Sequence, residues 1–363
     1  MPMSILDVAL DTAHLDPDEY VRALMRWHFR PETGTPYWLR RSATLDFDPL
    51  TDIHGIDDLT RFPNVADELR DVAVEDLIPR GLGPQPRIAG VYESGGTTGA
   101  PKRMLLFQDW LDVQVQWEDW TSGCPAGGPV NILAVTPSGP HIIGECATQA
   151  ARRTGGLKFA LDLDPRWVKV LVAQDRTAEV ADYTDHLLAQ AADILRSQRV
   201  DMLFITPPLL TLLATRGELV ELINKSVRVI RYGGARMDPE NLRFYRTYIF
   251  PGIEFRGMYG STTIMGSSRE RLHENHGGAV IFDAFSPYSF YRVVDPDDGA
   301  DVGFGERGRV VMNHLTKYLL LPNNLERDTA YRIAPPPGAV GCSVADVAPV
   351  ATFGGQRVIE GVY

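Results

Sequence analysis

Residues 94–102 read Ser-Gly-Gly-Thr-Thr-Gly-Ala-Pro-Lys, and the fold of the whole chain can be inferred outward from this stretch. It holds three glycines, three hydroxyl side chains and a lysine within nine residues. Glycines let a backbone bend tightly and present successive N–H groups to an anion. Hydroxyls add donors toward phosphate oxygens, and Lys102 adds a positive charge. The stretch is therefore predicted to hold a polyphosphate.

The segments on either side of this loop favour strands. Residues 87–92 precede it and residues 103–107 follow it, and both runs contain apolar side chains typical of strands. A Walker A loop needs Gly-x-x-x-x-Gly-Lys-Ser/Thr running straight into a helix, whereas here Pro101 separates the last glycine from the lysine. The spacing excludes a Walker A loop. It leaves a different phosphate-binding loop or a Gly-rich hairpin turn that binds nothing.

The stretch resembles the phosphate loop of the adenylate-forming superfamily, which includes acyl-CoA synthetases, non-ribosomal adenylation domains and luciferases. The resemblance implies that the loop holds the β- and γ-phosphates of ATP while a carboxylate attacks the α-phosphorus. The contacts that it implies for ATP fall on Ser94, Gly95, Gly96 and Gly99, and the catalytic contacts fall on Thr97, Thr98 and Lys102.

The composition is that of an ordinary globular protein. Hydrophobic residues make up 44% and charged residues 23% of 363 residues, a length that allows about two domains. The net charge of −11 disfavours a nucleic-acid partner, because a phosphate backbone demands a basic surface. The sequence shows no membrane-spanning run and its N-terminus is unlike a signal peptide, so we expect a cytoplasmic protein without a membrane partner.

The sequence predicts no metal site built by the protein alone. The three cysteines, Cys124, Cys146 and Cys342, are far apart and lack the spacing of a zinc site. His273 and His276 are three residues apart, but the spacing supplies no third ligand, so a polar loop is the expected structure.

Strands alternate with helices through the middle of the chain. A helix is expected after Asp16, a residue that can cap it, with Pro17 in its first turn. Strand patterns occur at 129–135, 157–161, 200–205, 227–232 and 253–258, and helical patterns at 108–120, 142–153, 178–198, 209–215 and 239–248. This alternation predicts an α/β fold with largely parallel sheets flanked by helices, whose ligands bind at the carboxyl ends of the strands.

The character of the sequence changes near residue 278. From there on, helical patterns fade, and short strand patterns follow at 279–284, 288–294 and 309–313. We therefore predict an α/β core over residues 1–277 and a smaller β-rich subdomain over residues 278–363.

A second motif follows the last strand of this core. Residues 257–263, Gly-Met-Tyr-Gly-Ser-Thr-Thr, resemble the Tyr-Gly-Ser/Leu-Thr-Glu motif of the same superfamily. The resemblance implies that Tyr259 stacks on adenine and that Thr262, a catalytic residue, contacts the α-phosphate. It also implies nucleotide contacts from Met258, Gly260 and Ser261.

The chain departs from this motif at Thr263, where the superfamily has glutamate. That glutamate normally helps to hold Mg²⁺, a hard cation that prefers carboxylate oxygens. The expected cofactors are ATP and Mg²⁺. Because of Thr263, either Mg²⁺ binding is weakened or it relies on phosphates and water.

Three further matches complete the predicted site. Residues Gly233, Gly234 and Ala235 resemble a Gly-Gly-Ala/Glu segment whose backbone borders adenine and the acyl pocket. Asp328 resembles the aspartate that accepts both ribose hydroxyls. His141 matches a position that lines the carboxylate pocket. The predicted acid pocket consists of His141, Gly234, Ile264, Met265 and Gly266, and its apolar members favour an aromatic or other hydrophobic acid.

The resemblance covers roughly residues 60–330. Full-length members continue into a hinge and a mobile C-terminal domain, which supplies a catalytic lysine, and we expect this domain to be absent here. The phenylacetate-CoA ligase branch is the most similar, together with stand-alone adenylating proteins of phenazine-antibiotic pathways. This implies secondary metabolism and antibiotic biosynthesis. It also implies a carrier protein or another partner that supplies the missing group, and it leaves a homodimer open.

Three functions are compatible with these observations. The first is ATP-dependent activation of a carboxylic acid as an acyl-adenylate, with release of pyrophosphate. The second is adenylation of nitrite for transfer to an amine, which a small polar pocket would favour. The third is a non-catalytic protein that binds a nucleotide or an acid as a partner in a pathway.

Overall fold

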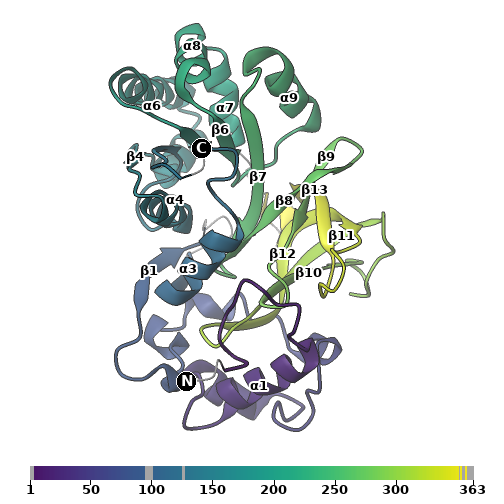
Figure 1. Ribbon diagram of the computed structural model, residues 1–363. Helices are drawn as coiled ribbons and strands as arrows, with labels where there is room; N and C mark the ends of the chain where they lie inside the picture. Colours follow the sequence, from purple (N-terminus) through teal and green to yellow (C-terminus); the bar gives the residue numbers. More distant parts are fainter. Residues whose placement is uncertain (1–3, 95–100, 125–126, 351, 354–355, 358–363) are drawn as a thin grey trace. The chain divides into compact units, whose positions relative to one another are not determined.

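The computed structural model describes residues 4–94, 101–124, 127–350, 352–353 and 356–357 (Figure 1). Contacts group the chain into two compact units. The first comprises Met1–Trp117, Gly260–Arg271 and Ile281–Val358, and the second comprises Glu118–Tyr259, Leu272–Val280 and Ile359–Tyr363. This grouping divides the chain differently from the predicted boundary between residues 277 and 278, because the N-terminal segment and the C-terminal strands share one unit.

The second unit is built on parallel strands. They follow the order β4-β3-β5-β6-β7, and each neighbouring pair is parallel. The strands are β3 (Ile132–Val135), β4 (Lys158–Ala160), β5 (Met202–Ile205), β6 (Val229–Tyr232) and β7 (Glu254–Ser261), the last of which ends in the first unit. The helices are α4 (Ile142–Arg153), α5 (Pro165–Ala173), α6 (Thr177–Ser197), α7 (Pro207–Ala214), α8 (Gly217–Ser226), α9 (Pro239–Phe244) and the π-helical turn η6 (Tyr245–Ile249).

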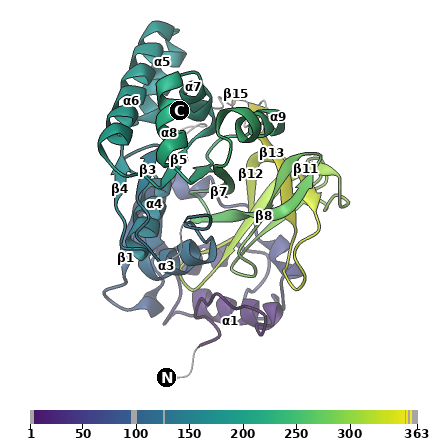
Figure 2. The same ribbon diagram turned by 45° about the horizontal axis from the view of Figure 1, so that its top comes forward.

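Continuous apolar sequence explains these central strands. Every residue of β3, β5 and β6 is buried, as expected for parallel strands covered on both faces. Helices α6, α7 and α8 lie side by side, and their apolar residues join the strands in one core, for example Leu187 and Leu210 with Leu203 and Ile230 (Figures 1 and 2). The predicted α/β fold with largely parallel strands flanked by helices is confirmed.

The first unit combines helices with an antiparallel ladder in the order β10-β11-β12-β13-β9. Its strands are β1 (Ile88–Glu93), β2 (Arg103–Phe107), β10 (Ser289–Val294), β11 (Arg307–Leu315), β12 (Leu320–Ile333), β13 (Ser343–Pro349), β14 (Thr352–Phe353) and β15 (Gln356–Arg357). Strands β8 (Gly266–His276) and β9 (Ala279–Asp283) are divided between the units. Its helices are α1 (Pro17–Phe29), α2 (Pro36–Arg41), α3 (Gln108–Trp117), η1 (Ser42–Thr44), η2 (Asp57–Arg61), η3 (Glu68–Arg70), η4 (Val74–Leu77) and η5 (Arg80–Leu82).

Local chemistry fixes the start of α1 as the sequence predicts. The Asp16 carboxylate accepts hydrogen bonds from the backbone N–H groups of Asp18 at 2.9 Å and Glu19 at 3.0 Å. Such a cap stabilises a helix by about 1 kcal/mol. One predicted loop is wrong: His273 and His276 lie within β8, because strand pairing continues through this polar segment. Within the described ranges, no helix is long and apolar enough to cross a membrane.

Candidate functional site

The ends of the predicted phosphate loop are held together by two hydrogen bonds. The Ser94 N–H donates to the Lys102 carbonyl oxygen, and the Lys102 N–H donates to Ser94 Oγ, both at 3.0 Å. Strands β1 and β2 pair antiparallel beside it, with Glu93 opposite Arg103, so the predicted strand–loop–strand arrangement is confirmed. Gly95, Gly96, Thr97, Thr98 and Gly99 lie outside the described residues. Their phosphate contacts therefore stay predictions.

Lys102 is largely buried but has a weak partner. Its Nζ lies 3.6 Å from Oδ1 of Asp67, and the two side chains are 15% and 79% exposed. Burial raises the pKa of Asp67, but hydrogen bonds and charge from Arg70 and Lys102 lower it below its usual value. An ion pair with so exposed a carboxylate contributes at most about 1 kcal/mol, so a polyphosphate can displace Asp67 from the Lys102 ammonium group.

The Tyr259 motif forms a strand and a turn. Strand β7 continues to Ser261, three residues beyond the predicted end, and β8 begins at Gly266. A turn connects them, closed by a hydrogen bond from the Met265 N–H to the Thr262 carbonyl oxygen at 3.1 Å. Gly260 is required here, because a Cβ at this position would lie 2.4 Å from the Gly266 carbonyl oxygen.

The members of this turn differ in exposure. Ser261 and Thr262 are half-buried, and a nucleotide contact needs such accessibility. Thr263, at the position of the superfamily glutamate, is 5% exposed, and Ile264 and Met265 are 1% exposed. The assignment of Ile264, Met265 and Gly266 to an acid pocket stays a prediction.

Strand β12 carries an irregularity at the predicted ribose ligand. Arg309 pairs with Thr329 and Val311 pairs with Leu325, so the single residue 310 of β11 faces residues 326–328 of β12. Extra residues of this kind form a bulge, which bends a strand and turns side chains out of the ladder. The bulge contains Glu326 and Asp328.

Glu326 is a residue to which the sequence reasoning gave no role. Asn324 Nδ2 donates to Glu326 Oε1 at 2.8 Å, and the Ser261 hydroxyl also hydrogen-bonds this carboxylate. Burial and the negative charge of Asp328 raise the pKa of Glu326, while Ser261, Asn324 and the positive charge of Lys102 lower it less. The first unit therefore brings Lys102, Ser261 and Asp328 within electrostatic or hydrogen-bonding range of Glu326. The sequence does hold a clue to this role, because Glu326 is a carboxylate two residues before the predicted ribose ligand Asp328.

The carboxyl edge of the parallel strands gathers the other predicted residues. Ile205 pairs with Tyr232, and Tyr232 with Gly257, so β5 and β6 end level with Gly257 of β7, which continues to Ser261. Gly233 and Gly234 follow β6, and Gly234 has a φ of +82°, a conformation that favours glycine.

Two more predicted positions lie at the same edge of the second unit. A Cβ on Gly233 would lie 2.6 Å from Cγ of Met258, so the backbone packs closely on that side chain, and Tyr259 follows it, half-buried. His141 is reached from β3 and forms the N-cap of α4. The structure thus groups Gly233, Gly234, Ala235, Met258 and Tyr259 with the loop to His141, as the parallel topology predicts.

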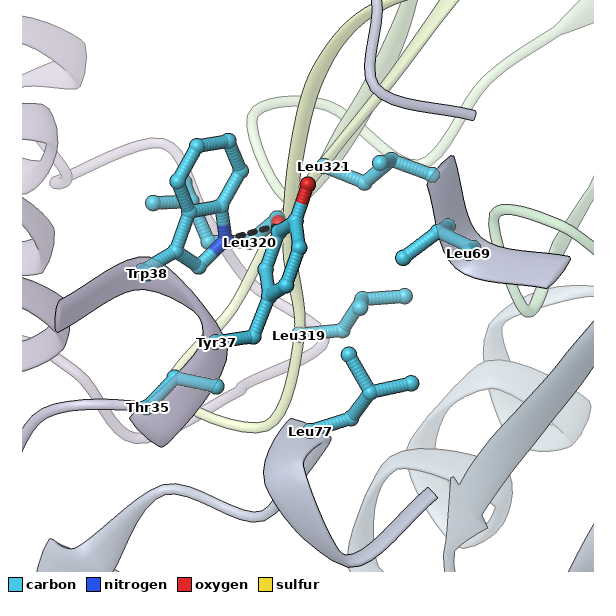
Figure 3. A pocket seen from close by; sticks show the side chains of 8 residues that line it. All are labelled: Thr35, Tyr37, Trp38, Leu69, Leu77, Leu319, Leu320 and Leu321. Carbon is cyan, nitrogen blue, oxygen red and sulfur yellow. Dashed lines mark hydrogen bonds between the residues drawn. The ribbon is translucent and has the colours of Figure 1, made fainter. Parts of the chain in front are cut away.

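A small apolar cavity lies elsewhere in the first unit. It is lined by Thr35, Tyr37, Trp38, Leu69, Leu77, Leu319, Leu320 and Leu321 (Figure 3). The Trp38 indole N–H donates to the Leu320 carbonyl oxygen at 2.8 Å and closes one side. Its volume of about 10 Å³ for a water-sized sphere admits one water molecule at most, so it is too small for an organic acid.

Solved structures of a CoA ligase have a similar fold. The chain aligns with 2-hydroxyisobutyryl-CoA ligase in complex with 2-HIB-AMP and CoA in the thioesterification state, with a TM-score of 0.62 and 15% identity over 91% of this chain and 67% of the ligase. For this ligase in the postadenylation state with R3-HIB-AMP, the TM-score is 0.64 and the identity 15%, over 95% and 69% of the two chains. No protein-family model and no curated protein sequence matches the chain.

At this level of identity the comparison establishes the fold, and the chain spans about two thirds of the length of these ligases. The narrower resemblance to the phenylacetate-CoA ligase branch and to phenazine-pathway proteins stays a prediction. The chain therefore shares its fold with 2-hydroxyisobutyryl-CoA ligase.

Proposed function

We propose that the protein uses ATP to activate a carboxylic acid as an acyl-adenylate. One carboxylate oxygen attacks the α-phosphorus, the bond from this phosphorus to the oxygen bridging the β-phosphate breaks, and pyrophosphate leaves. Such a transfer needs positioning and charge neutralisation more than a nucleophile from the protein. The observation that carries the proposal is that Lys102, which ends the Gly-rich loop, acts together with Ser261 and Asp328 on the carboxylate of Glu326.

Each unit contributes residues to this proposal. In the first unit, Lys102 and the loop residues would hold the phosphates, Thr262 the α-phosphate and Asp328 the ribose. In the second unit, Gly233, Gly234, Ala235 and Tyr259 would border adenine, and His141 would approach the acid. Ile264, Met265 and Gly266 are apolar or small, which supports an aromatic or other hydrophobic acid as the substrate.

Mg²⁺ is expected to bind together with ATP, and the first unit offers carboxylate oxygens, the ligands that this cation prefers. The described residues hold no group of three or more His, Cys, Asp or Glu side chains suited to a metal ion. Mg²⁺ in nucleotide sites commonly needs only one or two carboxylates, because phosphates and water complete its shell. Glu326 would supply such a carboxylate in place of the glutamate that the resemblance expects at Thr263, which leaves Asp328 to the ribose. Bound Mg²⁺ would neutralise phosphate charge.

This role of Glu326 predicts a changed metal requirement. We expect Glu326→Gln to raise the Mg²⁺ concentration for half-maximal pyrophosphate release by about tenfold, since an amide oxygen carries no charge. The matched control is Glu93→Gln, which alters another partly buried carboxylate that accepts from Arg103 at 2.9 Å. A Mg²⁺ titration for each variant is the measurement. Identical curves for Glu326→Gln and the wild type would exclude the role.

The pathway and the acceptor are further proposals that rest on the resemblance alone. They comprise a secondary-metabolite or antibiotic pathway and a carrier protein or other partner that receives the acyl group or completes the site. A homodimer is a separate proposal.

Pyrophosphate release from ATP and Mg²⁺ tests the proposed function directly. We expect release that depends on one class of acid when aromatic acids, aliphatic acids and nitrite are compared, with acid-free reactions as the baseline. Release of pyrophosphate with nitrite and with none of the carboxylic acids would mean that the substrate is an inorganic oxyanion and not a carboxylic acid. ATP binding measured by calorimetry, without release for any acid, would refute a stand-alone adenylating enzyme.

A further inference from the structure

Two buried side chains hold consecutive carbonyl groups of the turn between β7 and β8. Trp110 Nε1 donates to the Met265 carbonyl oxygen at 2.6 Å, and His314 Nδ1 donates to the Ile264 carbonyl oxygen at 2.5 Å. Trp110 and His314 are each 1% exposed, and all four residues belong to the first unit. Two side chains from distant parts of the sequence therefore converge on one dipeptide.

This dipeptide has an unfavourable backbone conformation. Met265 has φ of +44°, a region that L-residues with long side chains rarely adopt and that costs on the order of 1 kcal/mol or more. The Ile264 carbonyl belongs to the peptide group before Met265, and the Met265 carbonyl to the peptide group after it. Holding both carbonyls fixes both peptide planes, and hence both dihedral angles of Met265.

A chain of hydrogen bonds sets the orientation of the His314 ring. A carbonyl oxygen only accepts, so Nδ1 must carry the proton and Nε2 must accept from the Thr316 hydroxyl at 2.8 Å. That hydroxyl also accepts from the N–H groups of Tyr318 and Leu319, so its own proton is free to point at His314. The Trp110 ring packs against His314 with centroids 4.7 Å apart.

The same chain includes a second buried histidine that does not touch the turn. His28 Nε2 donates to the Thr316 carbonyl oxygen at 2.8 Å, and His28 Nδ1 accepts from the Thr35 hydroxyl at 2.7 Å. His28 is 0% exposed. It resembles His314 in burial and in bonding to Thr316, but it bonds neither carbonyl of the dipeptide, which makes it a suitable control.

We infer that His314 and Trp110 are positioning residues for the acid substrate, acting through the shape of the turn from Thr262 to Gly266. This inference rests on the proposed function, because that turn carries the residue expected at the α-phosphate and three residues of the expected acid pocket. Without the two donors, Met265 relaxes to a favourable φ and the pocket wall moves. Thr262 lies in this turn, whereas Ser94, Lys102 and Asp328, which are also expected to contact ATP, lie outside it, so most of the expected ATP contacts do not depend on the two donors.

Kinetics of four variants test the inference. We expect Trp110→Phe and His314→Ala to raise KM for the acid on the order of tenfold, with KM for ATP changed less than about twofold. His314→Asn keeps a donor near the Nδ1 position and should recover most of the affinity. His28→Ala should lower Tm and leave KM for the acid unchanged. An equal rise of KM in His28→Ala and His314→Ala would overturn the inference, because destabilisation alone would explain both.

Hydrogen exchange separates this inference from the proposed function. The amide of Met265 is bonded within the turn, so peptides covering residues 261–267 should exchange faster in Trp110→Phe and His314→Ala than in the wild type and in His28→Ala. This readout does not require turnover. A wild-type protein that releases no pyrophosphate refutes the function only, whereas unchanged exchange in both variants refutes the positioning role.

Discussion

Lys102→Met is expected to release pyrophosphate about 100-fold more slowly than the wild type, a loss typical for removal of one preorganised group that stabilises charge in a transition state. The side chain of Lys102 is 15% exposed, so its ammonium group acts in a poorly hydrated environment, where its attraction for phosphate is stronger than in water. Its described partner, Asp67, is 79% exposed and offers little competition. Single-turnover pyrophosphate release at saturating acid is the measurement.

Two variants distinguish this role from a general effect of charge. Lys102→Arg keeps the charge and should recover part of the rate, although a planar guanidinium cannot replace a compact ammonium group fully. Arg103→Met removes the next cation along β2, whose side chain is 59% exposed and paired with Glu93, and should change the rate less than about threefold. A wild-type rate in Lys102→Met, or equal losses in Lys102→Met and Arg103→Met, would contradict the assignment.

The elements that the sequence predicts well are those fixed by local chemistry. Strands β3, β5 and β6 were predicted correctly because each lies within a mainly apolar run that is longer than the strand itself. The start of α1 was predicted correctly because Asp16 caps it. The hydrogen bonds between Ser94 and Lys102 follow from two strands that meet at a Gly-rich loop. In each case neighbours in sequence carry the information.

The elements that the sequence reasoning missed depend on partners far along the chain. Strand β8 reads Gly-Ser-Ser-Arg-Glu-Arg-Leu-His-Glu-Asn-His, without the alternation that marks a strand, and its conformation comes from pairing in a sheet. The bulge of β12 that presents Glu326 is visible only in its register with β11.

His314 shows the same limit inside the candidate site. In the run Val310–Leu315 it and Asn313 are the polar residues of an otherwise apolar strand, which predicts no more than a place in the core. Its partner is the carbonyl oxygen of Ile264, fifty residues away. A hydrogen bond between a side chain and a distant backbone atom produces no repeating pattern in either segment. The spacing of residues therefore cannot predict this contact.

Acid should destabilise the protein steeply, because the two buried histidines are neutral in the native state. Burial lowers the pKa of His28 to about 4 and the pKa of His314 to about 3, below the ordinary histidine value of 6.5. The hydrogen bonds to Thr316 and Ile264 offset burial only in part. Below pH 6.5 the unfolded chain therefore takes up two protons that the native state does not bind. Stability is complete above this pH and is lost as the pH falls toward 4.

The expected loss is about 2.5 kcal/mol between pH 6 and pH 5 from these two residues, a large share of the 5–15 kcal/mol that stabilises most proteins. Urea unfolding followed by tryptophan fluorescence at both pH values measures it. The double variant His28→Gln/His314→Asn replaces both imidazoles by amides that do not titrate but still offer an N–H near the original donor.

This double variant should be less stable than the wild type at pH 7.5, because an amide fits an imidazole cavity imperfectly. Between pH 6 and pH 5, its free energy of unfolding should fall by about 2.5 kcal/mol less than that of the wild type. His54→Asn, which alters an exposed histidine of the same unit, should keep the wild-type pH dependence. Carboxylates cannot cause this difference in pH dependence between the wild type and the double variant, since both proteins contain the same carboxylates and most are ionised over this range. An unchanged slope in the double variant would mean that His28 and His314 already carry a second proton in the native state. The Thr35 and Thr316 hydroxyls would then have to accept from the two rings instead of donating to them.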